Sequence, residues 1–163
     1  MTSKLQHPFT LIVAGPSSCG KSTFVIRLLD CREQFCDVFT NIVWCHSENA
    51  SHHLKNVTFV KAVPDFENPE NVPTLIVLDD LMDSAYSTKV SQLFTKGWHH
   101  RNVSLVLITQ NFFHQGPSSR DISLNSKYIV VFKNPRDKAQ IVHLARQVYP
   151  ENISSFHKTS RRL

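Results

Sequence analysis

The stretch that decides the fold runs from Phe9 to Cys31 and reads FTLIVA, GPSSCGKS and TFVIRLLDC. The segment Phe9–Ala14 is mostly apolar without polar alternation, which predicts a strand buried on both faces. The segment Thr23–Cys31 carries apolar side chains at helical spacing, which predicts an amphipathic helix. Between them, Gly15–Ser22 fits G-x-x-x-x-G-K-[ST] at every fixed position. A strand, this loop and a helix in that order predict a phosphate-binding loop.

Each fixed residue of the loop has a chemical reason. Gly15 and Gly20 permit backbone angles forbidden to other residues and allow close approach to phosphate oxygens. The N–H groups and dipole of the helix start stabilise a negative phosphate. Lys21 is expected to reach the β- and γ-phosphates of ATP, and Ser22 to be a ligand of Mg²⁺. The residues predicted to hold the nucleotide are Gly15, Pro16, Ser17, Ser18, Cys19, Gly20, Lys21, Ser22 and Thr23.

A second apolar run ends in two carboxylates. Thr74–Leu78 predicts another buried strand, and Asp79 and Asp80 follow it directly. We predict that Asp79 holds Mg²⁺ through water, opposite Ser22, and that Asp80 orients or deprotonates the attacking water. The alternative is that the two aspartates lie in a loop and cap a helix, and the apolar strand that leads into them disfavours it. The long interval from Ser22 to Asp79 favours the ATPases in which an extra strand separates the two motifs.

A third apolar run, Val103–Ile108, ends in Thr109, Gln110 and Asn111. If it belongs to the same parallel sheet, its carboxyl end lies beside Asp79, at the edge where ligands gather. Gln110 then has two interpretations. It either hydrogen-bonds the γ-phosphate or the lytic water, or it satisfies the backbone of a loop.

Weaker patterns complete the predicted element order. Tyr128–Phe132 predicts a further buried strand, Asn41–Cys45 a shorter one, and Val57–Val60 the weakest of the set. Helices are predicted over Ala85–Phe94 and Arg136–Tyr149. Strands that alternate with helices predict an α/β fold with a mostly parallel central sheet.

The length and composition set outer limits on function. A chain of 163 residues has room for one domain, so we predict a single domain over 1–163, with flexible tails at 1–7 and 157–163. The apolar runs are too short to span a bilayer and no signal peptide is evident, which favours an intracellular protein without a membrane partner. The net charge of +5 favours a polyanionic partner. The four cysteines match no standard zinc spacing and fit a reducing compartment.

The ordered motifs resemble the FtsK–HerA superfamily of ring-forming, DNA-pumping ATPases. Within it, the sequence is most similar to the genome-packaging ATPases of poxviruses and of Polinton-like (Maverick) elements. The segments that carry the resemblance are Gly15–Ser22, Leu78–Met82, His99–Asn102, Thr109–Asn111, Ile122–Asn125 and Phe132–Asp137. The resemblance implies a RecA/ASCE-like P-loop NTPase fold, a three-layer sandwich around the central sheet.

The resemblance also implies roles for single residues. The Mg²⁺-binding acid of the family falls on Asp79, its catalytic acid on Asp80 and its polar sensor on Gln110. Many members carry Glu where this chain has Asp80, so the shorter side chain is expected to act through a water or a slight backbone shift, and hydrolysis should survive. Arg101 lies where the superfamily places an arginine finger, which a subunit supplies to its neighbour in the ring. The rivals for this role are Arg120 and Arg136.

We therefore expect a homo-oligomeric ATPase motor that packages double-stranded viral DNA into a capsid, in the host cytoplasm or nucleus or in the virion. A basic and aromatic group is the expected DNA contact, although helix ends and loops have the same composition. Its members are Lys89, Lys96, Trp98, His99, His100, Arg101, Phe112, Phe113 and His114. The alternatives are a nucleoside or nucleotide kinase, which normally needs an arginine-rich lid, and a nucleotide-gated adaptor, which needs no catalytic acid.

Overall fold

The computed structural model describes residues 4–31, 33, 38–47, 54–61, 63, 68–79, 81, 88–97, 102–112, 118–134 and 142–146. The chain divides into two compact units, Met1–Phe132 and Lys133–Leu163. The second unit is described only in part, with residues 142–146 helical inside the helix predicted over Arg136–Tyr149. The prediction of a single domain stays a prediction.

The first unit contains a parallel sheet of six strands in the order β3-β2-β4-β5-β1-β6. All of its strand pairings are parallel, which confirms the predicted α/β class. The strand bounds are Thr10–Ala14 (β1), Asn41–His46 (β2), Thr58–Lys61 (β3), Thr74–Asp79 (β4), Val103–Thr109 (β5) and Tyr128–Val131 (β6).

The strand order bears out one prediction and corrects another. Strand β5 lies between β1, which leads into the phosphate loop, and β4, which ends in Asp79. An extra strand therefore separates the two motifs, as the long interval between them predicted. Strand β6, in contrast, was expected to be buried on both faces, but its four residues are only half-buried. Its place at the end of the sheet, with β1 as its neighbour in the described part of the chain, explains the exposure.

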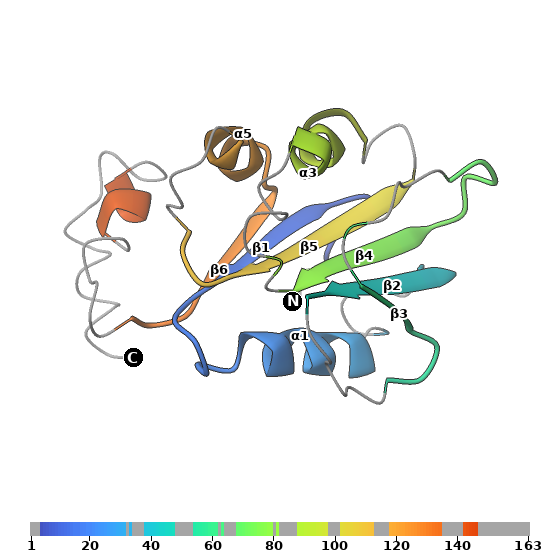
Figure 1. The fold of residues 1–163 in the computed structure, drawn as a ribbon, viewed down its shortest axis with the longest axis horizontal. Coiled ribbons are helices and arrows are strands. Elements are labelled where there is room, and N and C mark those ends of the chain that lie inside the picture. The colour runs from blue at the N-terminus through green and yellow to red at the C-terminus, as the bar shows by residue number, and fades with distance from the viewer. Residues whose placement is uncertain are drawn as a thin grey trace. The chain divides into compact units, whose positions relative to one another are not determined.

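Helices cover both faces of the sheet and complete a three-layer arrangement (Figure 1). Helix α1 (Lys21–Asp30) lies on one face, while α3 (Thr88–Gln92) and α5 (Ser119–Leu124) lie on the other (Figure 1). Helix α1 begins two residues before the predicted Thr23. Helix α3 lies within the predicted Ala85–Phe94 and continues as the π-helical turn η2 (Leu93–Gly97). Helix α5 was not predicted from the sequence.

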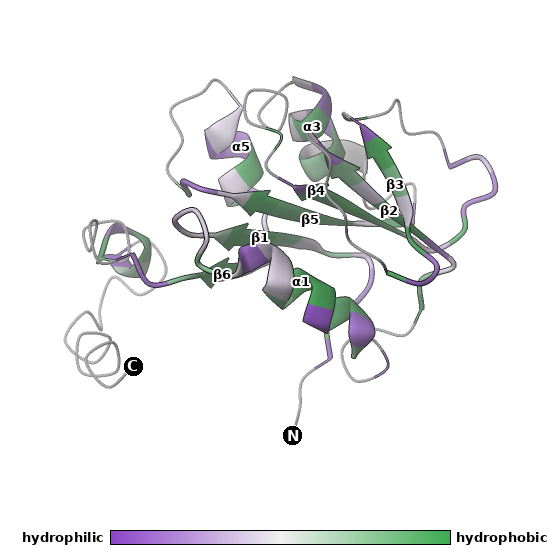
Figure 2. Ribbon diagram, turned by 60° about the horizontal axis from the view of Figure 1, so that its bottom comes forward, coloured by the Kyte–Doolittle hydropathy of each residue, from purple (hydrophilic) through white to green (hydrophobic). Residues whose placement is uncertain are grey.

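The core is built from the alternation of side chains along the central strands, which are strongly hydrophobic (Figure 2). Leu75 and Val77 of β4 pack in one cluster with Val25 and Leu29 of α1. Because successive side chains of a strand point to opposite faces, Ile76 and its equivalents in β5 point toward α3 and α5. Each such side chain, when fully buried, contributes about 1.5–3 kcal/mol.

Leu5, Gln6 and His7, which we predicted to belong to a flexible tail, contact the first unit. Leu5 packs against the core cluster. The ring nitrogens of His7 lie 2.7 Å from Ser104 Oγ and 2.7 Å from Asn102 Oδ1, at the start of β5. Burial lowers the pKa of His7, and the hydrogen bond that its ring donates to Asn102 Oδ1 opposes this only in part.

Candidate functional site

The loop from Gly15 to Gly20 joins β1 to α1 and leaves a helix start open to an anion. The Gly15 N–H donates to the Thr109 carbonyl at 3.2 Å, which ties the loop to the end of β5. Ser18 (φ 60°) and Gly20 (φ 95°) turn the chain into the helix. No side chain caps α1, and its first turn holds no acidic residue. The N–H groups of this turn and the helix dipole therefore suit a phosphate.

The two glycines of the loop are needed for different reasons, which corrects the common explanation we gave them. Gly20 has the positive φ that favours glycine. Gly15 does not; a Cβ at this position would lie 2.6 Å from Phe132 Cβ and 3.0 Å from Cys19 Sγ. Gly15 is therefore required by the close approach of the residue after β6, not by its backbone angle.

Lys21 is the charged residue of the loop, and only 9 % of it is exposed. Its Nζ donates to the Pro16 carbonyl at 2.8 Å. A buried ammonium group is costly unless it is paired, and this carbonyl supplies one partner. The contact holds the Lys21 ammonium group against the loop. This is the position expected of a lysine that binds the outer phosphates.

Ser22 and Asp79 meet although they are 57 positions apart in the chain. Ser22 Oγ donates to Asp79 Oδ1 at 3.2 Å. The sheet register produces this contact, because Asp79 is paired with Ile108 of β5 and Thr109 with Ala14 of β1. A hydroxyl and a carboxylate are hard oxygen ligands, and Mg²⁺ binds few protein ligands while it keeps several waters. The two residues therefore fit a Mg²⁺ site that is completed by water and phosphate.

The other predicted site residues fall partly within the described chain. Gln110 is exposed and directly follows β5, the strand between the phosphate loop and Asp79. Asp80 and Arg101 lie outside the described residues. Arg120 is exposed on α5, and Arg136 is not described. The structure thus brings together Lys21, Ser22 and Asp79, with Gln110 at the same edge of the sheet.

Sequence reasoning missed two features of this edge. His46, at the end of β2, is paired in register with Asp79 and is buried. His46 directly follows Asn41–Cys45, the apolar run that predicted β2. Phe24 and Phe132 form an edge-to-face pair beside the loop, with ring centroids 5.9 Å apart. No spacing in the sequence connects these two residues. They come together because β6 pairs with β1 in the sheet.

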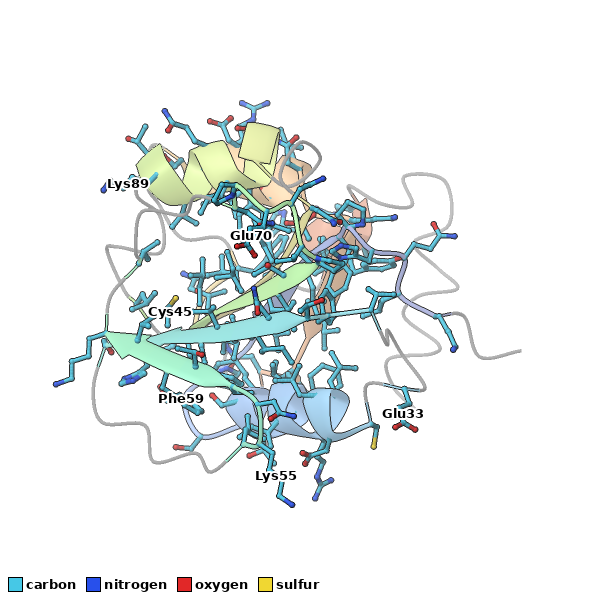
Figure 3. All side chains as sticks on the ribbon, turned by 90° about the vertical axis from the view of Figure 1, so that its right-hand side faces the viewer. Glu33, Cys45, Lys55, Phe59, Glu70 and Lys89 are labelled. Carbon is cyan, nitrogen blue, oxygen red and sulfur yellow. The ribbon has the colours of Figure 1, made fainter. Side chains whose placement is uncertain are left out.

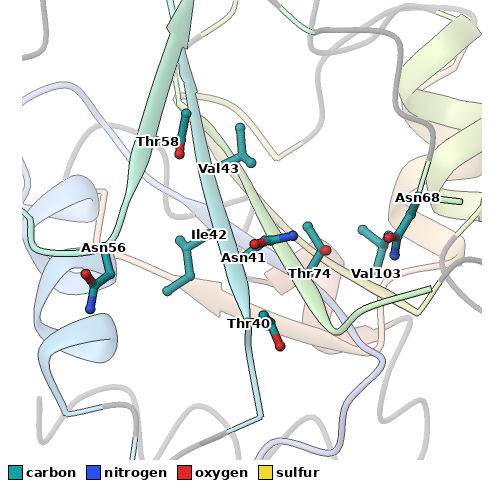
Figure 4. Close-up of a pocket in the computed structure, with 9 residues that line it drawn as sticks. All are labelled: Thr40, Asn41, Ile42, Val43, Asn56, Thr58, Asn68, Thr74 and Val103. Carbon is teal, nitrogen blue, oxygen red and sulfur yellow. The ribbon is translucent and has the colours of Figure 1, made fainter. Parts of the chain in front are cut away.

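A separate cavity of about 210 Å³ opens at the opposite edge of the sheet, where β2, β3, β4 and β5 begin (Figure 4). The described side chains that line it, such as Asn41, Thr58 and Thr74, are uncharged. Its described lining supplies neither a cation nor a helix N-terminus, whereas the carboxyl edge supplies both, in Lys21 and the start of α1. We therefore assign the phosphate chemistry to the carboxyl edge.

The predicted DNA-contacting group is described only in part. Lys89 on α3 is exposed and points outward (Figure 3). Phe112 is 7 % exposed, so its ring belongs to the core and is not available for stacking on a base. The residues 98–101, 113 and 114 lie outside the described chain. Among the described residues, no helix is long and apolar enough to cross a membrane.

Comparison with solved structures gives the fold independently of the site. The chain is similar to the genome packaging NTPase B204 from Sulfolobus turreted icosahedral virus 2 in complex with AMP, with a TM-score of 0.57 and 14 % identity. The match covers 93 % of this chain and 89 % of that one. The chain has a P-loop NTPase fold. The likeness confirms the P-loop NTPase fold that the resemblance implied.

Two further structures share this P-loop fold. The N-terminal domain of zonular occludens toxin from Neisseria meningitidis has a TM-score of 0.53 and 13 % identity, over 82 % of this chain and 81 % of that one. Thermomonospora curvata EccC (ATPases 2 and 3) has a TM-score of 0.51 and 14 % identity, over 81 % of this chain and 31 % of that one. No protein-family description and no curated protein matches the sequence.

Proposed function

We propose that this protein is an FtsK–HerA-type ATPase that hydrolyses ATP and moves double-stranded DNA, as the packaging motor of a virus or of a virus-like element. The observation that carries the proposal is the 3.2 Å contact between Ser22 Oγ and Asp79 Oδ1. It brings a phosphate loop and a strand-end acid to one point, which binding and hydrolysis of a nucleoside triphosphate require.

The residues of the carboxyl edge have distinct roles in this proposal. The N–H groups of the loop and Lys21 hold the β- and γ-phosphates. Ser22 and Asp79 hold Mg²⁺, which when bound neutralises charge on those phosphates. Asp80 orients the attacking water and Gln110 contacts the γ-phosphate or that water. The likeness in fold to a viral NTPase that has been crystallised with ATP-γS and with AMPPCP supports ATP as the substrate.

A ring of subunits supports hydrolysis in this proposal because the arginine finger is supplied in trans. Asn102, the next residue after Arg101 in the sequence, lies at the start of β5. Its carbonyl accepts a hydrogen bond from the Thr74 N–H at 3.1 Å. Its Nδ2 donates to the Asn71 carbonyl at 2.8 Å. The seven residues of β5, at about 3.3 Å each, separate this edge from the phosphate loop. In the proposal, an Arg101 finger serves a neighbouring subunit, with a gain of roughly 10³–10⁵ in rate.

The proposed DNA substrate rests on charge and on the fold. The sequence carries a net charge of +5, and Lys89 is a described, exposed member of its basic group. Lysine and arginine contacts to phosphates suit a motor that must grip any sequence. One relative in fold is described as the DNA-packaging ATPase from Sulfolobus turreted icosahedral virus. Capsid proteins are the further partners expected of such a motor.

The test is release of free phosphate from ATP with and without double-stranded DNA. We expect DNA to stimulate turnover, and Lys21→Ala and Arg101→Ala each to reduce it at least about 100-fold. Lys55→Ala is the matched control, because Lys55 is exposed near β3 and points away from the sheet (Figure 3). In mixed rings, Arg101→Ala subunits should lower the activity of intact neighbours.

Three outcomes would contradict the proposal. An ATP turnover rate that is unchanged by double-stranded DNA, in a protein that never forms a ring, would exclude a motor function. A phosphorylated acceptor in place of free phosphate would show a kinase. Full function of an Asp80→Asn protein in cells would show a nucleotide-gated adaptor.

A further inference from the structure

Two half-buried aromatic rings flank the phosphate loop on the side away from Asp79. Phe24 follows Ser22 by two positions on α1, and Phe132 directly follows β6. Their ring centroids lie 5.9 Å apart at an interplanar angle of 79°. The Phe132 N–H donates to the Ala14 carbonyl at 2.8 Å, so the end of β1 holds this residue.

Phe132 extends along the whole loop. Its Cβ lies 2.6 Å from where a Cβ on Gly15 would be, and its Cε1 lies 4.0 Å from the corresponding point on Gly20. The side chain therefore extends from Gly15, near its Cβ, to Gly20, near its ring. Gly15 leaves room for this side chain, and the 4.0 Å approach at Gly20 is ordinary contact. Phe132 therefore lies against the loop as well as against the core cluster.

The two flanks of the loop face opposite parts of a bound nucleotide. The sheet order places β5 and β4, with Asp79, on one side of β1 and places β6, with Phe132, on the other. Ser22, Asp79 and Gln110 mark the flank where the terminal phosphate is hydrolysed. The opposite end of the triphosphate, which carries the ribose and the base, must then leave the loop toward the β6 flank.

We propose that Phe132 is the platform on which the nucleobase stacks, with Phe24 fixing the orientation of its ring. The proposal rests on the proposed function, since it requires a nucleoside triphosphate in the loop. An aromatic face stacks on a base of any identity, because every base has a π-face. The edge-to-face contact with Phe24 leaves Phe132 fewer orientations to lose on binding. Phe132 thus contributes affinity for the base without selecting adenine over guanine.

The test compares three Mg²⁺-complexed probes, ATP, GTP and inorganic tripolyphosphate, by calorimetric titration. Phe132→Leu keeps apolar bulk against the sheet but removes the aromatic face. It should weaken the binding of ATP and of GTP by about 5- to 150-fold, the range expected for the loss of one base–aromatic stack. Tripolyphosphate has no base, so its affinity should stay within about twofold. Phe132→Tyr should restore the affinity for both nucleotides.

Tyr128→Leu is the matched control, because Tyr128 is a half-buried aromatic residue at the other end of β6. It should leave all three affinities unchanged. An equal loss of tripolyphosphate affinity in Phe132→Leu would overturn the platform, since it would show a distorted loop. Unchanged ATP affinity in Phe132→Leu would also overturn it. A wild-type protein that binds neither ATP nor tripolyphosphate would instead refute the proposed function, and the platform with it.

Discussion

Replacement of Gly15 by alanine tests how the end of β6 constrains the phosphate loop. The new Cβ would lie 2.6 Å from Phe132 Cβ, about 1 Å inside the optimal carbon–carbon separation of about 3.5–4.0 Å. Phe132 cannot rotate this atom away, because Cβ is bonded to a backbone that donates to Ala14 at 2.8 Å. The strand end or the loop must therefore move.

The expected cost follows from overpacking of this kind, at about 1–3 kcal/mol. For a chain of this length the midpoint of thermal unfolding falls by about 2–4 °C per kcal/mol, so we expect a drop of about 2–12 °C. Thermal and urea unfolding, followed by circular dichroism without nucleotide, measure it. In a Phe132→Gly background the opposing Cβ is absent, and the same alanine should cost at least about 1 kcal/mol less.

Gly20→Ala is the matched control for this cycle. Its Cβ would meet no atom nearer than 4.0 Å, but its φ of 95° is strained for alanine at a cost of about 1–2 kcal/mol. That cost should be the same with or without Phe132 Cβ. If Gly15→Ala is equally destabilising in both backgrounds, the steric explanation of Gly15 is wrong.

Two further predictions concern titratable groups away from the loop. Because the pKa of His7 lies below 6.5 in the folded state, the unfolded chain takes up the proton first as the pH falls, and stability is lost downward from about pH 6.5. The free energy of unfolding of His7→Gln should therefore fall less between pH 7 and pH 5 than that of the wild type. An equal fall in the two proteins would contradict this. Burial raises the pKa of the Cys45 thiol to about 12, so iodoacetamide at pH 8 should label the exposed Cys31 and spare Cys45 until the protein unfolds. Mass spectrometry checks this, and early labelling of Cys45 would contradict its burial.

Much of the fold was predictable because its signals are local. The loop Gly15–Ser22 is read from one contiguous motif, and β4 and β5 from apolar runs without alternation. Strand β6 gave the same signal but lies at the end of the sheet and is only half-buried. An apolar run shows that a strand is hydrophobic, but not how many neighbours it will have. Helix α5 was missed because six residues are too few to show a period.

The site divides in the same way. Lys21, Ser22, Asp79 and Gln110 were predicted because their residue types follow strands or the loop at recognisable positions. The position of Phe132 beside the phosphate loop could not be predicted, because it depends on the pairing of β6 with β1. The reason that position 15 requires glycine was wrongly predicted for the same reason. The atom that excludes a side chain at Gly15 belongs to Phe132, which follows β6.

The sequence by itself determined that a strand, a phosphate loop and a helix follow one another, and that two more buried strands end in acids and amides. Those features depend on backbone periodicity and on residues a few positions apart. Only the tertiary structure decided that Ser22 and Asp79 meet at 3.2 Å and that Phe132 lies along the loop. The order of strands in a sheet decides such contacts between distant segments, and no spacing along the chain specifies that order.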